Sequence, residues 1–122
     1  MGIANYTNMS ELLNAALKTG ESVSISDMVN EALMRGVILA SEGEPADRGD
    51  LENGFIYIVE ALCREGAIKA VPENETEVRL LKLYESGELS ANGYGGTDGD
   101  QFLNIKWIAV TDNIPVIVNI NF

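Results

Sequence analysis

The sequence contains no histidine and a single cysteine, Cys63. Without imidazole, the chain lacks the commonest general base and the commonest transition-metal ligand of proteins. A lone thiol excludes an internal disulfide and is typical of proteins from reducing compartments. These absences argue against a histidine-dependent enzyme and against a zinc site.

Positive charge is also scarce. Eight Lys and Arg stand against nineteen Asp and Glu, which gives a formal net charge of −11 on 122 residues. A surface that binds nucleic acid or an anionic membrane needs cationic side chains that displace counterions or contact the lipid headgroups. We therefore expect neither of these partners, and the charge favours either a cationic protein partner or solubility alone.

Long apolar runs are absent as well. No stretch approaches the roughly 18–20 residues that cross a bilayer, and residues 1–6 lack the basic and apolar parts of a signal peptide. We expect a cytoplasmic protein. A hydrophobic content of 46% is typical of a globular chain, and the length suits one domain spanning residues 1–122.

Apolar residues recur at helical spacing through the first two thirds of the chain. Ser26 and Asp50 are expected N-caps, Asn74 with Glu77 resembles a capping box, and Gly20 is an expected helix stop. Two of the apolar runs, 55–59 and 79–84, also fit strands. The pattern predicts helices over residues 8–18, 27–41, 51–64 and 75–86, and short extended pieces over residues 21–25 and 67–71.

The last third of the sequence has a different pattern. Five glycines between residues 87 and 100 predict a long surface loop. Alternating apolar residues then predict two strands, 101–111 and 114–122, joined by a turn at 112–113, with Trp107 in the core. We therefore predict an α+β fold, with N-terminal helices packed on a small antiparallel sheet that ends in a C-terminal β-hairpin. A winged-helix arrangement is one topology that this order allows.

Carboxylates gather in several loops of the predicted fold. Loops rich in Asp and Glu can pair with Lys and Arg of a basic protein, and a tyrosine between glycines can anchor such a contact. The alternative is that these loops are only solvated. The candidate partner-binding residues are Glu42, Glu44, Asp47, Asp50, Glu52, Tyr94, Asp98 and Asp100.

We expect no metal, no cofactor and no catalytic residue. The carboxylates of residues 98–100 lack the spacing of a calcium loop, and the glycines of residues 93–97 lack the Gly-Lys-Ser/Thr ending of a phosphate loop. Cys63 lies in an apolar helical stretch with no histidine to activate it. The sequence therefore does not indicate an enzyme.

Two hypotheses of different classes follow from the residues. The first is a small acidic inhibitor that neutralises a basic effector, such as a bacterial immunity protein against a toxin nuclease. The second is a structural or assembly subunit of a phage or bacterial complex, with its contact at the hairpin edge beside Pro115. The sequence leaves open whether the chain is a monomer or a homodimer.

Overall fold

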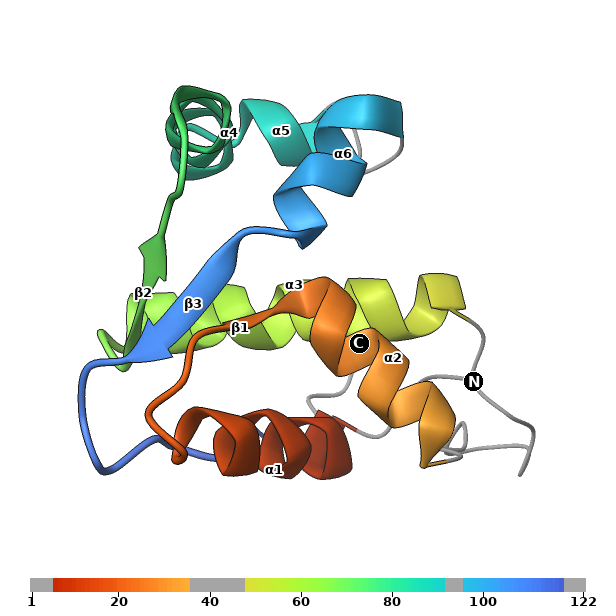
Figure 1. Cartoon of the computed structure of the whole chain (residues 1–122), viewed down its shortest axis with the longest axis vertical. Coiled ribbons are helices and arrows are strands. Elements are labelled where there is room, and N and C mark those ends of the chain that lie inside the picture. The colour runs from red at the N-terminus through yellow and green to blue at the C-terminus, as the bar shows by residue number, and fades with distance from the viewer. Residues whose placement is uncertain (1–5, 36–47, 92–95, 118–122) are drawn as a thin grey trace.

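The computed structural model describes residues 6–35, 48–91 and 96–117. It confirms an α+β fold in which helices surround an antiparallel sheet (Figure 1). The elements in chain order are α1 (Tyr6–Leu17), β1 (Val23–Ser24), α2 (Ile25–Met34), α3 (Arg48–Arg64), β2 (Ile68–Val71), α4 (Glu75–Glu85), α5 (Glu88–Ala91), α6 (Gly96–Leu103) and β3 (Lys106–Ala109).

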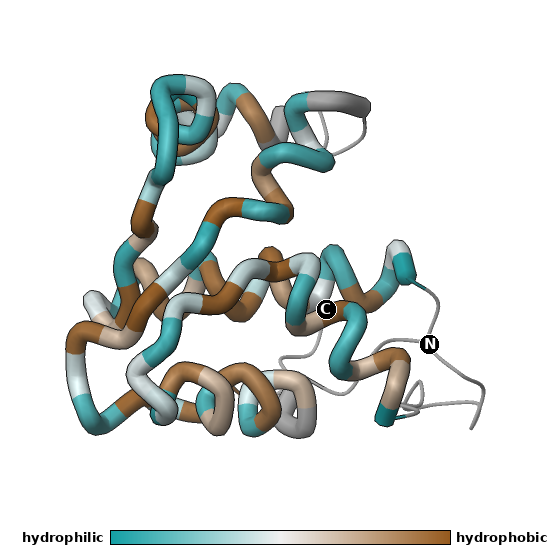
Figure 2. Tube along the Cα trace, viewed as in Figure 1, coloured by the Kyte–Doolittle hydropathy of each residue, from teal (hydrophilic) through white to brown (hydrophobic). Residues whose placement is uncertain are grey.

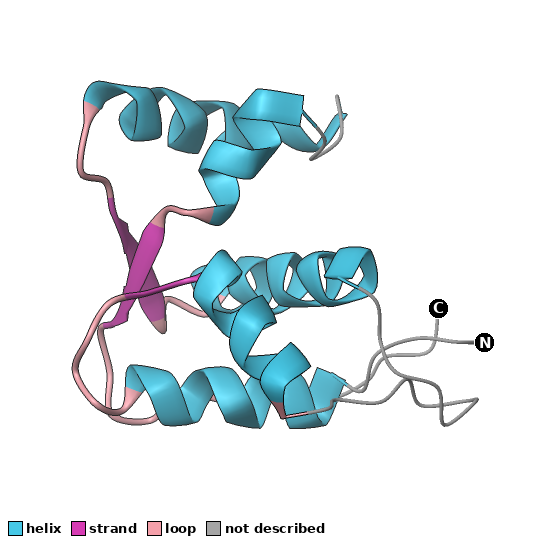
Figure 3. Cartoon of the chain, turned by 45° about the vertical axis from the view of Figure 1, so that its right-hand side comes forward, coloured by secondary structure: helices cyan, strands magenta, loops and turns pink. Residues whose placement is uncertain are grey.

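The sheet is small, and β3 forms its centre. The strand order is β1-β3-β2, with both pairs antiparallel. Trp107 of β3 lies opposite Val23 on one side and opposite Ala70 on the other. Helices α1, α2 and α3 lie on one side of the sheet, and α4, α5 and α6 lie beyond its other end (Figure 3).

The N-cap of the second helix lies two residues before Ser26, the expected cap. The Ser24 hydroxyl accepts a hydrogen bond from the Asp27 N–H at 3.0 Å, and the Asp27 carboxylate accepts one from the Ser24 N–H at 3.3 Å. Ser24 is therefore the N-cap of a complete capping box. Leu33 of the same helix is 40% exposed. The buried residues of α2 are Ile25, Met28, Val29 and Ala32.

Helix α3 supplies much of the core. Its apolar residues recur every three or four positions and are almost fully buried, which settles the 55–59 run as helix. The helix ends before Gly66, which adopts a left-handed conformation with φ of +71°. Hydrophobic and hydrophilic residues alternate along the helices around the sheet, as expected for helices with one buried side (Figure 2). The buried apolar residues of α3 are Leu51, Phe55, Ile56, Ile58, Val59 and Leu62.

The structure contradicts the loop predicted for residues 87–100. Helices α5 and α6 occupy much of this stretch, and α6 also replaces the first residues of the predicted strand 101–111. Phe102 is fully buried, and its ring lies 4.8 Å from that of Tyr84. Burial of this aromatic side chain stabilises a helix that the glycines alone disfavour. The chain between β2 and β3 is thus a helical insertion.

The structure also differs from the prediction after β3. Residues 114–117 form no strand, and β3 pairs with β2 and β1 instead of with this segment. Two buried side chains of α1 hold it: the Ser10 hydroxyl accepts a hydrogen bond from the Ile117 N–H at 2.8 Å, and the Asn14 amide donates to the Pro115 carbonyl at 3.1 Å. Residues 118–122 lie outside the described part of the chain.

Candidate functional site

The helical insertion begins with α4, whose start is fixed by two side chains. The Asn74 side chain accepts a hydrogen bond from the Glu77 N–H at 2.9 Å, which confirms Asn74 as the N-cap. The Glu77 carboxylate reaches back to the Glu73 N–H, also at 2.9 Å, one residue before the cap. Negative charge near a helix N-terminus is favourable, so this arrangement stabilises α4 while leaving Glu73 and Glu75 exposed.

Residues 73–103, which we call the acidic insertion, carry an excess of negative charge. Seven of them are acidic and two are basic, for a net charge of −5 in 31 residues. The six carboxylates other than that of Glu77 lie on exposed residues. The acidic insertion projects from one end of the sheet (Figures 1 and 3). Its seven acidic residues are Glu73, Glu75, Glu77, Glu85, Glu88, Asp98 and Asp100.

The chain's few cations are largely engaged with its own carboxylates. All eight Lys and Arg fall in the described residues, and five of them form ion pairs there. Each pair neutralises one acid, so the surplus of negative charge remains. The pairs are Arg35–Glu31, Arg48–Glu52, Arg64–Glu60, Arg79–Asp98 and Lys106–Asp27.

The structure places four of the eight candidate partner-binding residues. Asp50 and Glu52 lie in the first turns of α3, which begins at Arg48, so Asp50 is not the N-cap that was predicted, and the Glu52 carboxylate is 3.9 Å from Arg48. Asp98 and Asp100 lie on α6, where Asp98 contacts Arg79 of α4 at 3.2 Å and Asp100 is exposed. The other four candidates, Glu42, Glu44, Asp47 and Tyr94, lie outside the described residues.

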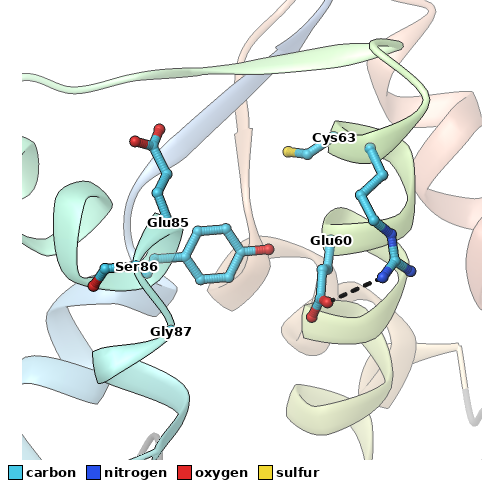
Figure 4. A pocket seen from close by; sticks show the side chains of 7 residues that line it. Glu60, Cys63, Glu85, Ser86 and Gly87 are labelled. Carbon is cyan, nitrogen blue, oxygen red and sulfur yellow. Dashed lines mark hydrogen bonds and ion pairs between the residues drawn. The ribbon is translucent and has the colours of Figure 1, made fainter.

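A cleft separates the end of α3 from the end of α4. Its cavity, about 440 Å³, has Glu60 and Cys63 on one wall and Glu85, Ser86 and Gly87 on the other (Figure 4). Arg64 and Tyr84 complete its lining. Arg64 contacts Glu60 at 3.4 Å, an ion pair that leaves Glu60 about half exposed. Each wall thus carries one carboxylate, and Arg64 offsets part of the charge of Glu60.

Cys63 lies within this cleft but is a weak nucleophile. Burial first, and then the negative charges of Glu60 and Glu85, raise the pKa of the Cys63 thiol from 9.0 to about 11. At neutral pH the sulfur therefore stays protonated, and the thiolate is the reactive form of cysteine. The electrostatics of the cleft favour binding of a cation over thiol chemistry.

Two further observations concern the described residues only. Nowhere among residues 6–35, 48–91 and 96–117 do three potential Cys, Asp or Glu ligands converge as a metal centre would require. Within the same ranges, no helix has both the length and the apolar character needed to span a membrane.

Sequence reasoning missed the cleft. Neither Glu60 nor Glu85 is among the candidate partner-binding residues. The two residues are 25 positions apart, and they lie on opposite walls of the cleft because β2 turns the chain back between α3 and α4 (Figure 4). The only signal in the sequence was that each lies near the C-terminal end of a predicted helix.

Comparisons with known proteins add no further information. The chain matches no protein-family model, no curated protein and no solved structure. The case for function therefore rests on the charge and geometry described above.

Proposed function

We propose that this chain is an acidic inhibitor that binds and neutralises a basic protein, such as a toxin nuclease countered by its immunity protein. The observation that carries the proposal is the acidic insertion, with seven carboxylates against two cations, one of which already pairs with Asp98. A dense negative surface on a folded scaffold is complementary to a surface rich in Lys and Arg.

The chemistry of such a contact is direct. Proteins that act on nucleic acid present Lys and Arg to phosphates, and a carboxylate accepts the same donors, often through two parallel hydrogen bonds from one arginine. Carboxylates held on helices α4 and α6 can thus occupy a phosphate-binding surface. Long-range attraction between opposite charges also speeds association, which benefits an inhibitor that must act before its target does.

The proposal is tested by capture from a lysate of the source organism. The tagged chain is loaded at about 0.1 M salt and washed at about 1 M, and mass spectrometry identifies the proteins in each eluate. The Debye length falls from about 10 Å to about 3 Å over this range. We expect a basic protein that is retained at low salt and released at high salt, and whose own activity is inhibited when the purified chain is added back.

Two results would contradict the proposal. One is capture of a neutral partner, or of only the chain itself, that is indifferent to salt; this would support the assembly-subunit hypothesis. The other is a basic protein that binds but keeps its full activity, because an inhibitor must block the function of its target.

A further inference from the structure

A second cavity adjoins the cleft between α3 and α4. It measures about 400 Å³ and shares Cys63, Tyr84 and Glu85 with the first cavity of about 440 Å³. It runs along β2, where Ile68, Lys69 and Ala70 line it, and it reaches Leu81 of α4 and Trp107 of β3. We call the two cavities together the α3–α4 groove. The groove is thus open along a strand of the sheet.

Strand β2 lies at the edge of the sheet in the described part of the chain. Within residues 6–35, 48–91 and 96–117, β2 pairs only with β3. The Val110 N–H donates to the Ala67 carbonyl at 2.9 Å, and the register continues with Ile68 opposite Ala109. Because hydrogen-bonded and non-hydrogen-bonded pairs alternate in antiparallel strands, the backbone N–H and C=O of Ile68 and Ala70 face away from β3. They are available to another strand.

A buried donor also lies on the groove. Trp107 is 3% exposed, and its indole N–H has no hydrogen-bond acceptor among the described residues. Buried N–H groups of this kind nearly always have a partner. Its neighbour across the ladder is Ala70, whose side chain is a single methyl. A small residue at this position leaves room for a chain at the edge of β2 to approach the tryptophan.

The groove is lined by charged side chains of both signs. Glu60 lines it from α3 and Glu85 from α4, with the two on opposite walls (Figure 4). Cys63 lies on the same wall as Glu60, and the negative charges of Glu60 and Glu85 both raise the pKa of its thiol. Arg64 offsets part of the charge of Glu60, and Lys69 adds one cation at the strand. The lining thus balances two carboxylates with two cations, and among the described residues Glu85 is the one of these two carboxylates without an ion pair, so that a Lys or Arg entering beside it would complete a pair.

We propose that the α3–α4 groove binds an extended segment of the basic partner, which adds to β2 as a strand and inserts a Lys or Arg side chain between Glu60 and Glu85. Side chains of a strand added to β2 alternate between the two faces of the sheet, so every second one points toward the groove. This inference rests on the proposed function, because it names the site at which the inhibitor would hold its target.

The test uses a defined probe, an acetylated and amidated peptide of four Lys-Thr repeats, with a Gln-Thr peptide as the uncharged control. We expect the Lys-Thr peptide to shift the amide resonances of Ile68, Ala70 and Gly87 and to slow hydrogen exchange of the Ala70 N–H. Two further probes are methylated on backbone nitrogen: one peptide at all its lysine amides, and the other at all its threonine amides. Strand addition uses one set of amides, so one methylated peptide should bind and the other should not.

Variants of the protein test the carboxylates. Glu60→Gln combined with Glu85→Gln should raise the Kd for the Lys-Thr peptide about tenfold, because two partly exposed charge pairs are lost. The matched control, Glu11→Gln with Glu21→Gln, changes the net charge equally at exposed positions outside the groove and should alter Kd less than about twofold.

Several results would overturn the inference. These are equal binding of the Gln-Thr peptide, equal binding of both methylated peptides, or shifts confined to surfaces away from β2. The lysate capture separates this failure from failure of the proposed function. If the Glu60→Gln, Glu85→Gln variant still captures and inhibits the basic partner like the wild type, the proposed function stands and the groove is not its site.

Discussion

At the scale of single residues, two polar side chains inside the protein hold the chain after β3. Ser10 is fully buried and accepts a hydrogen bond from the Ile117 N–H, while Asn14, one helical turn later, contacts the carbonyls of Ile114 and Pro115. A segment without strand partners of its own needs such bonds, because buried backbone groups are costly to leave unpaired. These contacts also remove Pro115 from the hairpin edge at which an assembly contact was predicted.

Replacing Ser10 tests this interaction. Ser10→Ala leaves the Ile117 N–H without its acceptor in a partly buried place, which should lower the free energy of unfolding by about 1–2 kcal/mol. Urea denaturation followed by circular dichroism measures the change. Glu11→Ala, at the exposed neighbouring position of α1, should stay within about 0.5 kcal/mol. Equal effects of the two substitutions would show that Ser10 does not hold the segment.

Cys63 yields a second prediction, on pH dependence. Its pKa is raised from 9.0 to about 11 by burial and then by Glu60 and Glu85. Alkylation by iodoacetamide, a reaction of the thiolate, should therefore rise with pH to a midpoint near 11 in the folded protein. In urea the midpoint should be near 9.0. Because the folded state binds the proton more tightly, its contribution to stability is complete below pH 9 and is lost as the pH rises toward 11.

The control for this prediction lies in the cleft itself. Glu60→Gln with Glu85→Gln removes the two charges and leaves burial in place, so the midpoint should fall but remain above 9.0. A folded protein whose thiol already titrates near 9.0 would contradict the description of the cleft.

At the scale of elements, the apolar period of the sequence predicts the helices better than it predicts their first residues, because Ser24 caps α2 in place of Ser26 and α3 begins at Arg48, before Asp50. Asn74, Gly20 and Gly66 mark real ends, and α3 and α4 have nearly the predicted bounds. The predictions failed where a contact distant in sequence decides the structure. Phe102 makes a helix of a glycine-rich stretch by packing on Tyr84, and Ser10 captures residues whose alternation predicted a strand. No local pattern contains these partners.

The start of α2 provides the prediction for this scale. Ser24→Ala removes the side chain that caps the helix and should lower the free energy of unfolding by about 1 kcal/mol. Ser26, which the sequence alone marked as the cap, lies within the first turn of α2, so Ser26→Ala should change it by less than about 0.5 kcal/mol. Thermal and urea unfolding of the two variants decide between the caps. A larger loss for Ser26→Ala would contradict the observed boundary.

At the scale of the whole molecule, charge and fold together support one function. The net charge of −11 was evident from composition, but its distribution was not. The structure shows that five cations are engaged within the chain and that the acidic insertion stands on one end of the sheet. The candidate residues of the sequence are divided: Asp98 and Asp100 fall in this insertion, whereas Asp50 and Glu52 begin α3. Asp50 and Glu52 were predicted at the start of the helix 51–64, whereas the helix that carries Asp98 and Asp100 could not be predicted, because it lies in a glycine-rich stretch.

The central claim is that the acidic insertion, and not net charge alone, binds a basic protein. The most direct measurement compares two variants of equal charge in the lysate capture at about 0.1 M salt. One carries Glu73→Lys with Glu75→Lys in the acidic insertion, and the other carries Glu11→Lys with Glu21→Lys on and just after α1. We predict that the first loses the basic partner and the second retains it. Equal retention, or equal loss, by the two variants would contradict the account.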